Sequence, residues 1–155
     1  MGNQLVDFFR HRRQQPGQEA IDWQTKRDEW LRSIDELYSR VEELLADSTK
    51  SGDVVIGRSQ TQITEGFVGS YTAPVLVISD GNERVDLIPK GFTVVSASGR
   101  VDLRGQRDTV TLLRDAGAGE PGWLVVLQRI PKLVTAPLDA TTLTTALDRV
   151  MLPLP

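Results

Sequence analysis

The chain has 155 residues, of which 39% are hydrophobic and 25% are charged, and these proportions are typical of one folded domain. The formal net charge of −3 gives no overall electrostatic attraction to nucleic acid or to anionic lipid. The absence of cysteine excludes disulfide bonds, thiolate catalysis and cysteine-ligated zinc. We therefore expect a single domain over residues 1–155 in the cytoplasm, with no signal peptide and no membrane-spanning segment.

The N-terminal segment predicts a short helix over residues 3–15. Its apolar patch comprises Leu5, Phe8 and Phe9. Basic residues follow at 10–13, where positive charge complements the negative end of the helix dipole. The Pro-Gly pair at 16–17 is expected to end this helix.

The longest periodic segment spans residues 23–46 and contains neither glycine nor proline. Its apolar residues recur at helical spacing: Trp23, Trp30, Ile34, Leu37, Val41 and Leu44. The opposite face of this predicted helix is charged. A helix with one wide apolar face must bury that face, and the β-strands expected after it are the natural surface to cover it.

From Val54 onward, short segments rich in β-branched residues alternate with glycine, proline and aspartate, which indicates strands joined by tight turns. The clearest hairpin turns at residues 80–82, where Asp-Gly-Asn accommodates positive φ angles. Pro74 is expected at the start of a strand, because proline has no N–H for a ladder. We also expect a strand over residues 92–98 and a flexible loop over 116–122.

Short connections between successive strands imply antiparallel pairing, and helices placed before and after the strands imply the α+β class. We predict an N-terminal helical hairpin packed on an antiparallel β-meander or small, partly open barrel of six to eight strands. A C-terminal helix follows, with Asp139 as its expected N-cap. Within the single domain, the helical segment covers residues 1–50, the meander 53–135 and the last helix 139–151.

Catalytic chemistry is poorly supported by the sequence. The single histidine, His11, lies in a basic run, and no group is suggested to orient it as a catalytic base. No calcium-loop spacing occurs, and the glycine-rich stretch at 117–122 precedes a strand and not a helix. We therefore assign no catalytic, cofactor-binding or metal-binding residue, expect no cofactor, and expect the protein not to be an enzyme.

Three arginines form the candidate site for an anion or nucleic acid: Arg100, Arg104 and Arg107. Asp102 alternates with them along the expected strand, which favours a salt-bridged and self-neutralised surface. No aromatic residue is interleaved with these arginines to stack on bases. We therefore rank nucleic acid below protein and small molecules as a partner.

Trp23 begins the long helix, beyond the expected reach of the sheet, and large aromatic side chains often anchor protein interfaces. The candidate partner-binding residues are Leu5, Phe8, Phe9 and Trp23. The leading hypothesis is a non-enzymatic protein-interaction module, an accessory, immunity or antitoxin-like subunit of a bacterial system, that binds another protein or its own copy through the N-terminal helices. The first alternative is a β-barrel that binds a small molecule or oligosaccharide, including a carboxylate-dependent hydrolase. The second is a nucleic-acid-associated factor that uses the arginines.

Overall fold

The computed structural model describes residues 3–13, 16–66, 68–93, 98–115 and 122–153, and the side chains of residues 11–22 lie outside this description. The helices are α1 (Asn3–Arg13), α2 (Pro16–Leu44), α3 (Ala46–Lys50) and α4 (Ala140–Val150). The strands are β1 (Val55–Glu65), β2 (Gly69–Ser79), β3 (Arg84–Gly91), β4 (Arg100–Arg104), β5 (Thr109–Asp115), β6 (Gly122–Gln128) and β7 (Val134–Pro137). The strand expected over 92–98 and the loop expected over 116–122 fall largely outside the described residues.

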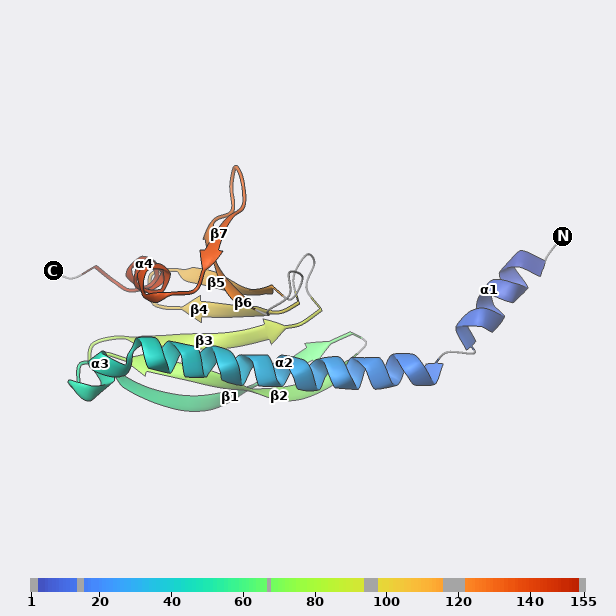
Figure 1. Ribbon diagram of the computed structural model, residues 1–155, viewed down its shortest axis with the longest axis horizontal. Coiled ribbons are helices and arrows are strands. Elements are labelled where there is room, and N and C mark those ends of the chain that lie inside the picture. Colours follow the sequence, from blue (N-terminus) through green and yellow to red (C-terminus); the bar gives the residue numbers. More distant parts are fainter. Residues whose placement is uncertain (1–2, 14–15, 67, 94–97, 116–121, 154–155) are drawn as a thin grey trace.

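The strands form one open sheet in the order β1-β2-β3-β4-β5-β6-β7, and each neighbouring pair is antiparallel. This confirms the α+β class and the predicted antiparallel meander. The sheet bends, so that β1–β3 lie below β4–β7 in the view of Figure 1. The turn between β2 and β3 contains Gly81 at φ +93°, which is the positive φ angle that the Asp-Gly-Asn sequence predicts.

Helix α2 supplies the centre of the hydrophobic core. Its fully buried side chains are Trp30, Ile34, Leu37, Tyr38 and Val41. They pack against the inner residues of the sheet, so the apolar stripe predicted from the sequence is confirmed as core. The helix begins at Pro16, a residue that suits the first helical position because its missing N–H has no intrahelical partner there.

Helix α4 closes the core at the other end of the chain and packs near β4, β5 and β6. Its buried residues are Leu143, Ala146 and Val150. Asp139 is the N-cap, as predicted: its carboxylate accepts a hydrogen bond from the Thr142 N–H at 2.8 Å. The Thr142 hydroxyl in turn accepts from the Asp139 N–H at 2.9 Å, which completes a capping box.

Pro74 lies in the middle of β2, opposite Gln60, so the expectation that it starts a strand was wrong. The cause is the short ladder between β2 and β3, which covers only Leu76–Ser79 on β2. The Pro74 carbonyl accepts a hydrogen bond from the Tyr38 hydroxyl at 2.6 Å, so the backbone groups of Pro74 face away from β1. An N–H at Pro74 would point toward β3, but β2 and β3 are not paired at this position. The proline therefore removes no hydrogen bond from the sheet.

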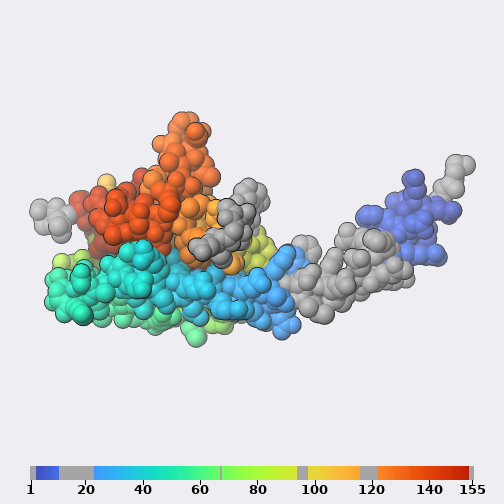
Figure 2. All heavy atoms as spheres, viewed as in Figure 1, coloured from blue at the N-terminus to red at the C-terminus, as the bar shows by residue number. Residues whose placement is uncertain are grey.

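Helix α1 stands beyond the N-terminal end of α2, away from the sheet (Figures 1 and 2). It does not lie alongside α2 as a helical hairpin would require, and in this detail the structure differs from the predicted arrangement. The described side chains of α1, at residues 3–10, are all exposed. The core described above therefore forms without α1.

Candidate functional site

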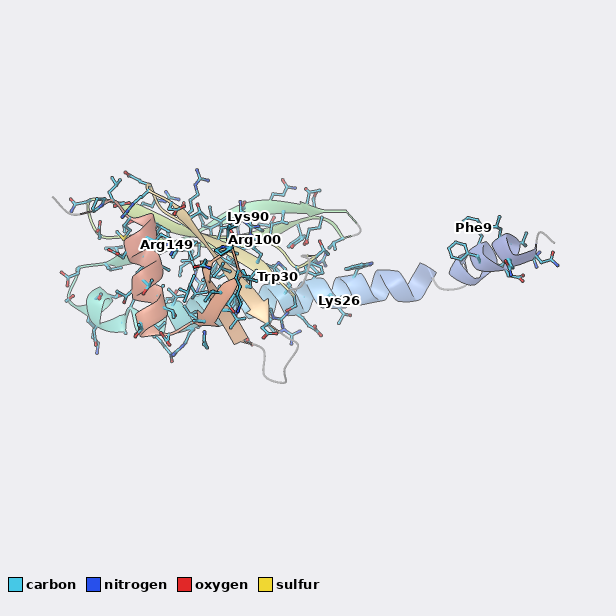
Figure 3. The ribbon with its side chains drawn as sticks, turned by 90° about the horizontal axis from the view of Figure 1, so that it is seen from above. Phe9, Lys26, Trp30, Lys90, Arg100 and Arg149 are labelled. Atoms are coloured by element: carbon cyan, nitrogen blue, oxygen red, sulfur yellow. The ribbon has the colours of Figure 1, made fainter. Side chains whose placement is uncertain are left out.

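The apolar patch of α1 is exposed on a projecting helix. Leu5 is 70% exposed, Phe8 53% and Phe9 61%. The two phenylalanine rings pack edge to face, with their centroids 5.1 Å apart. Figure 3 shows Phe9 far from Lys26 on α2 and from the sheet. The structure therefore brings Leu5, Phe8 and Phe9 together, in a place where no part of the described core covers them.

Trp23 belongs to a different surface. Its ring is half-buried and lies 6.2 Å, centroid to centroid, from that of Phe92, just after β3. The expectation that Trp23 lies beyond the reach of the sheet was wrong, because β1 and β2 have eleven residues each and the chain after β3 extends to α2. The structure thus does not join Trp23 to the α1 patch.

A hollow of about 390 Å³ lies beside Trp23, and we call it the Trp23 pocket. Its wall is made of two aromatic rings, two cations, one carboxylate and two hydroxyl side chains: Trp23, Phe92, Lys26, Arg114, Glu29, Thr93 and Ser98. The Lys26 ammonium lies 5.2 Å from the centroid of the Trp23 ring, within range of a cation–π interaction. The buried Nε of Arg114 has no hydrogen-bond partner, and neither cation forms an ion pair within the described part of the chain.

Two residues of this pocket, Phe92 and Thr93, bind Glu65, a buried carboxylate for which the sequence predicts no role. It accepts hydrogen bonds from the Tyr71 hydroxyl at 2.5 Å, the Phe92 N–H at 3.0 Å, and the N–H and hydroxyl of Thr93 at 2.9 and 2.6 Å. Burial, followed by the hydrogen bond and charge of Glu65, raises the pKa of Tyr71 above its usual range. Four donors satisfy Glu65, so we interpret it as a structural clamp between β1 and the end of β3.

One of the three candidate arginines, Arg100, is neutralised by a carboxylate. The Arg100 side chain, labelled in Figure 3, donates to both carboxylate oxygens of Asp102 at 2.8 and 3.2 Å. This hydrogen bond raises the pKa of Arg100, and Asp102 itself is buried. Arg104 and Arg107 are exposed and have no ion pair within the described residues. The predicted salt-bridged pattern is therefore confirmed at Arg100.

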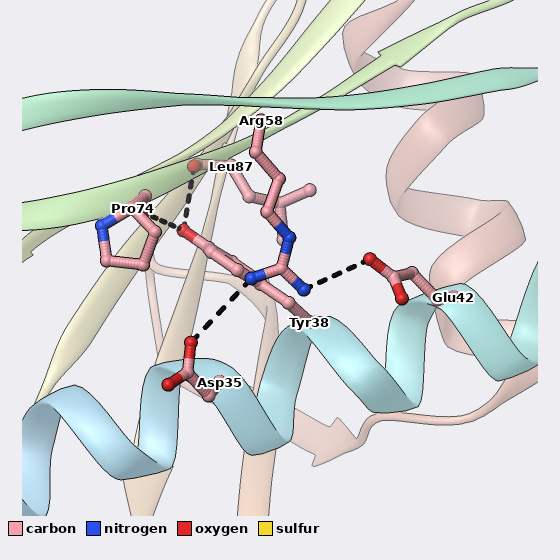
Figure 4. Close-up of polar contacts among 6 residues, drawn as sticks. All are labelled: Asp35, Tyr38, Glu42, Arg58, Pro74 and Leu87. Carbon is pink, nitrogen blue, oxygen red and sulfur yellow. Dashed lines mark hydrogen bonds and ion pairs between the residues drawn. The ribbon is translucent and has the colours of Figure 1, made fainter.

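A polar cluster joins β1 to α2 (Figure 4). The Arg58 guanidinium lies 3.1 Å from Glu42 and 3.7 Å from Asp35, both on α2. The same guanidinium lies 5.5 Å from the centroid of the Tyr38 ring. Beneath it, the Tyr38 hydroxyl donates to the carbonyls of Pro74 at 2.6 Å and Leu87 at 3.0 Å. Burial raises the pKa of Tyr38 above its usual range.

Within the described residues there is no group of three or more histidine, aspartate or glutamate side chains placed to hold a metal ion. No helix in the described part of the chain is both long and apolar enough to cross a membrane. The side chain of His11 lies outside the described residues, so its expected exposure stays a prediction. No protein-family model, no curated protein and no solved structure matches this chain.

Proposed function

We propose that this protein is a non-enzymatic interaction module that binds another protein through α1 and the start of α2. The observation that carries the proposal is the α1 patch: Leu5, Phe8 and Phe9 are more than half exposed on a helix that contributes nothing to the described core. An accessory, immunity or antitoxin-like subunit of a bacterial system is the kind of protein that this architecture fits.

The energetic argument concerns the two phenylalanines. Full burial of such a side chain contributes about 1.5–3 kcal/mol, and aromatic side chains are frequent hot spots of interfaces. Phe8 and Phe9 remain 53% and 61% exposed, and a groove of another protein would bury this remaining area. Packing against a partner would also stabilise α1 itself, because helices of this length are marginal alone in water.

The positive charge of α1 indicates which charge the partner's binding surface should carry. The segment 3–13 contains Arg10, Arg12 and Arg13 against the single acid Asp7. Its formal charge is therefore +2, whereas the whole chain carries −3. We propose a partner surface that is apolar at its centre and acidic at its edge, because opposite charges steer association and reject wrong partners.

The test compares Phe9→Asp with Gln4→Asp, which adds the same charge at an exposed position of the same helix. Each tagged full-length chain is used to capture proteins from its native cell, and captured proteins are identified and then purified for titration. We expect Phe9→Asp to weaken binding by about 2 kcal/mol or more, about thirtyfold in Kd, and Gln4→Asp to have little effect. A purified partner that binds both variants with the wild-type Kd would overturn the proposal.

A second copy of the chain is an outcome of the same experiment. Light scattering of the purified wild type and of Phe9→Asp reports whether the α1 patch holds copies together. A mass that falls to that of one chain only in Phe9→Asp would assign the patch to self-association. Trp23→Ala is measured beside them, with melting as a check, because Trp23 also packs against the core.

The Trp23 pocket favours one further candidate function, the binding of a small organic anion with a flat apolar body. Lys26 and Arg114 are cations without carboxylate partners in the described residues, and the rings of Trp23 and Phe92 form an apolar wall. The wall also holds the carboxylate Glu29, so its two cations leave one net positive charge. Apolar rings beside a few charged and polar groups are typical of ligand sites. Titration with indole-3-acetate and with neutral indole-3-acetamide, in wild type and Arg114→Gln, tests it. Equal affinity for the two probes would reject a role for the cations.

A further inference from the structure

The outer edge of β1 is a long, regular strand edge with no pairing strand in the sheet. β1 is the first strand of the sheet and pairs on one side only, with β2. Its eleven residues pair without a register shift and include no proline. Edge strands are usually protected by shortness, a bulge, a proline or a free lysine, because a regular open edge pairs readily with another strand. The opposite edge strand, β7, has four residues and ends in Pro137.

The direction of the free backbone groups on β1 follows from Pro74. Directly opposite residues of an antiparallel ladder point their N–H and C=O groups either toward each other or both away. Pro74 is opposite Gln60, and its carbonyl points away from β1 to the Tyr38 hydroxyl. Gln60 must therefore point its backbone groups out of the sheet edge. By alternation, the outward residues are Ile56, Arg58, Gln60, Gln62 and Thr64.

This edge is accessible. The four successive residues 57–60 are all exposed, which means that solvent reaches both faces of the strand at this point. Within the described residues, no backbone hydrogen bond outside the β1–β2 ladder engages residues 55–64. The outward N–H and C=O groups are therefore free to pair with an extended chain.

No free charge protects the edge either. The charged residues of β1 are Arg58 and Glu65. Arg58 is held by Glu42 and Asp35 on α2, and Glu65 is buried among four donors. The remaining side chains at the exposed middle of the strand are serine, glutamine and threonine, which are uncharged.

We infer that β1 pairs antiparallel with β1 of a second copy of the chain, around a two-fold axis at Gln60. Gln60 is the central residue of β1, so an axis there gives full overlap of the two strands. Each Gln60 then exchanges both backbone hydrogen bonds with Gln60 of the other copy. In this register Arg58 faces Gln62 and Ile56 faces Thr64, so no two like charges are opposite each other.

A second copy is favoured over an unrelated peptide because the strand is compatible with itself. A two-fold axis brings the same edge of both chains together, and closed pairing uses up both open edges at once. The two seven-stranded sheets would join into one continuous sheet whose outer strands are the short, proline-ended β7 strands. This pairing is separate from the α1 patch, which plays no part in it.

Charge reversal at the axis tests the pairing in the full-length chain. Gln60→Glu and Gln60→Lys each place two like charges side by side on the axis, and we expect each to raise the dimer Kd at least about tenfold. An equimolar mixture of the two variants should regain the wild-type dimer, now as a mixed species. A wild type with the mass of one chain at about 0.1 mM, or single variants that dimerise as well as the wild type, would overturn the inference.

Cysteine cross-linking fixes the register, since the natural chain has no cysteine. Paired residues at Gln60 would have Cα atoms about 5.5 Å apart, within the range of about 4.4–6.8 Å that a disulfide needs. Under mild oxidation, Gln60→Cys should form a covalent dimer quickly. Thr72→Cys, exposed on the neighbouring strand β2, is the control and should remain reduced. Equal cross-linking of the two variants, or of neither, would reject the β1 pairing.

Discussion

Tyr38→Phe should destabilise the protein although it removes a single oxygen atom. Tyr38 is fully buried, and its hydroxyl donates to the carbonyls of Pro74 and Leu87 at the point where β2 and β3 separate. Phenylalanine retains the ring and its contact with Arg58 but cannot donate. The substitution therefore isolates the hydrogen bonds from the packing of the ring.

The expected cost is about 1–3 kcal/mol. A typical hydrogen bond contributes about 0.5–1.5 kcal/mol net, and a buried acceptor left without a donor costs about 1–3 kcal/mol. The loss of one hydroxyl proton affects two carbonyls, but one proton serves them both, so we do not add two full penalties. For a chain of this size, 1 kcal/mol corresponds to about 2–4 °C in Tm, so the melting temperature should fall by about 2–12 °C.

Urea denaturation with an unchanged m-value is the appropriate assay, since a change in m would indicate a changed folded or unfolded state. Thr64→Val is the control, because it removes a hydroxyl that pairs with Ser70 on the exposed face of the same ribbon. That variant should remain within about 0.5 kcal/mol of wild type. If Tyr38→Phe lowers the free energy of unfolding no more than Thr64→Val does, the Tyr38 hydroxyl does not stabilise β2 and β3 where they separate.

Three further results are expected. Burial raises the pKa of both tyrosines of the chain, so above pH about 10 the folded protein keeps two protons that the unfolded chain releases. The free energy of unfolding should therefore fall as the pH rises beyond that value. Tyrosinate absorbance should appear only when the protein unfolds. Gly99→Ala should cost about 1–3 kcal/mol because its Cβ would collide with the Trp30 ring, whereas Gly57→Ala has open space, and equal melting of the two would contradict this. Leu37→Asp should unfold or aggregate the protein, since an unpaired charge in the core costs several kcal/mol; a soluble variant that melts like wild type would show that the stripe is not core.

The sequence predicted correctly those features that depend on residues close together in the chain. The stripe on α2 follows from helical spacing, and the cap of α4 follows from the chemistry of Asp139 and Thr142 within one turn. The position of α1 could not be predicted in this way. Its patch is apolar enough to pack on α2, and nothing in the order of residues distinguishes packing within the chain from packing on another molecule.

Strict alternation of buried and exposed residues does not hold along the whole β1–β2 ribbon. Near its junction with β3, the buried residues of β2 are even-numbered, Leu76 and Ile78, whereas farther out they are odd-numbered, Tyr71, Ala73 and Val75. The register with β1 stays regular throughout, so no bulge explains the change. A two-stranded ribbon twists more than a wide sheet, and the twist turns the opposite face toward the core. The burial of Glu65 could not be predicted from alternation for this reason: its face becomes the inner one only after the twist.

The opening between β2 and β3 explains why Tyr38 and Glu65 place polar groups in the core. Beyond Leu76 the β2–β3 ladder stops, and backbone groups along the opening need partners other than a strand. At the near end the Tyr38 hydroxyl bridges the carbonyls of both strands, and at the far end the Glu65 carboxylate binds the N–H groups of Phe92 and Thr93. The Glu65 carboxylate can only accept hydrogen bonds, and it lies beside N–H donors. The Tyr38 hydroxyl donates, and it lies beside carbonyl acceptors. Tyr38 thus serves a carbonyl on each side of the opening, and Glu65 serves the chain that leaves β3. Within the described residues, no comparable side chain bonds to the backbone along the outer edge of β1, the edge at which we propose pairing with a second copy.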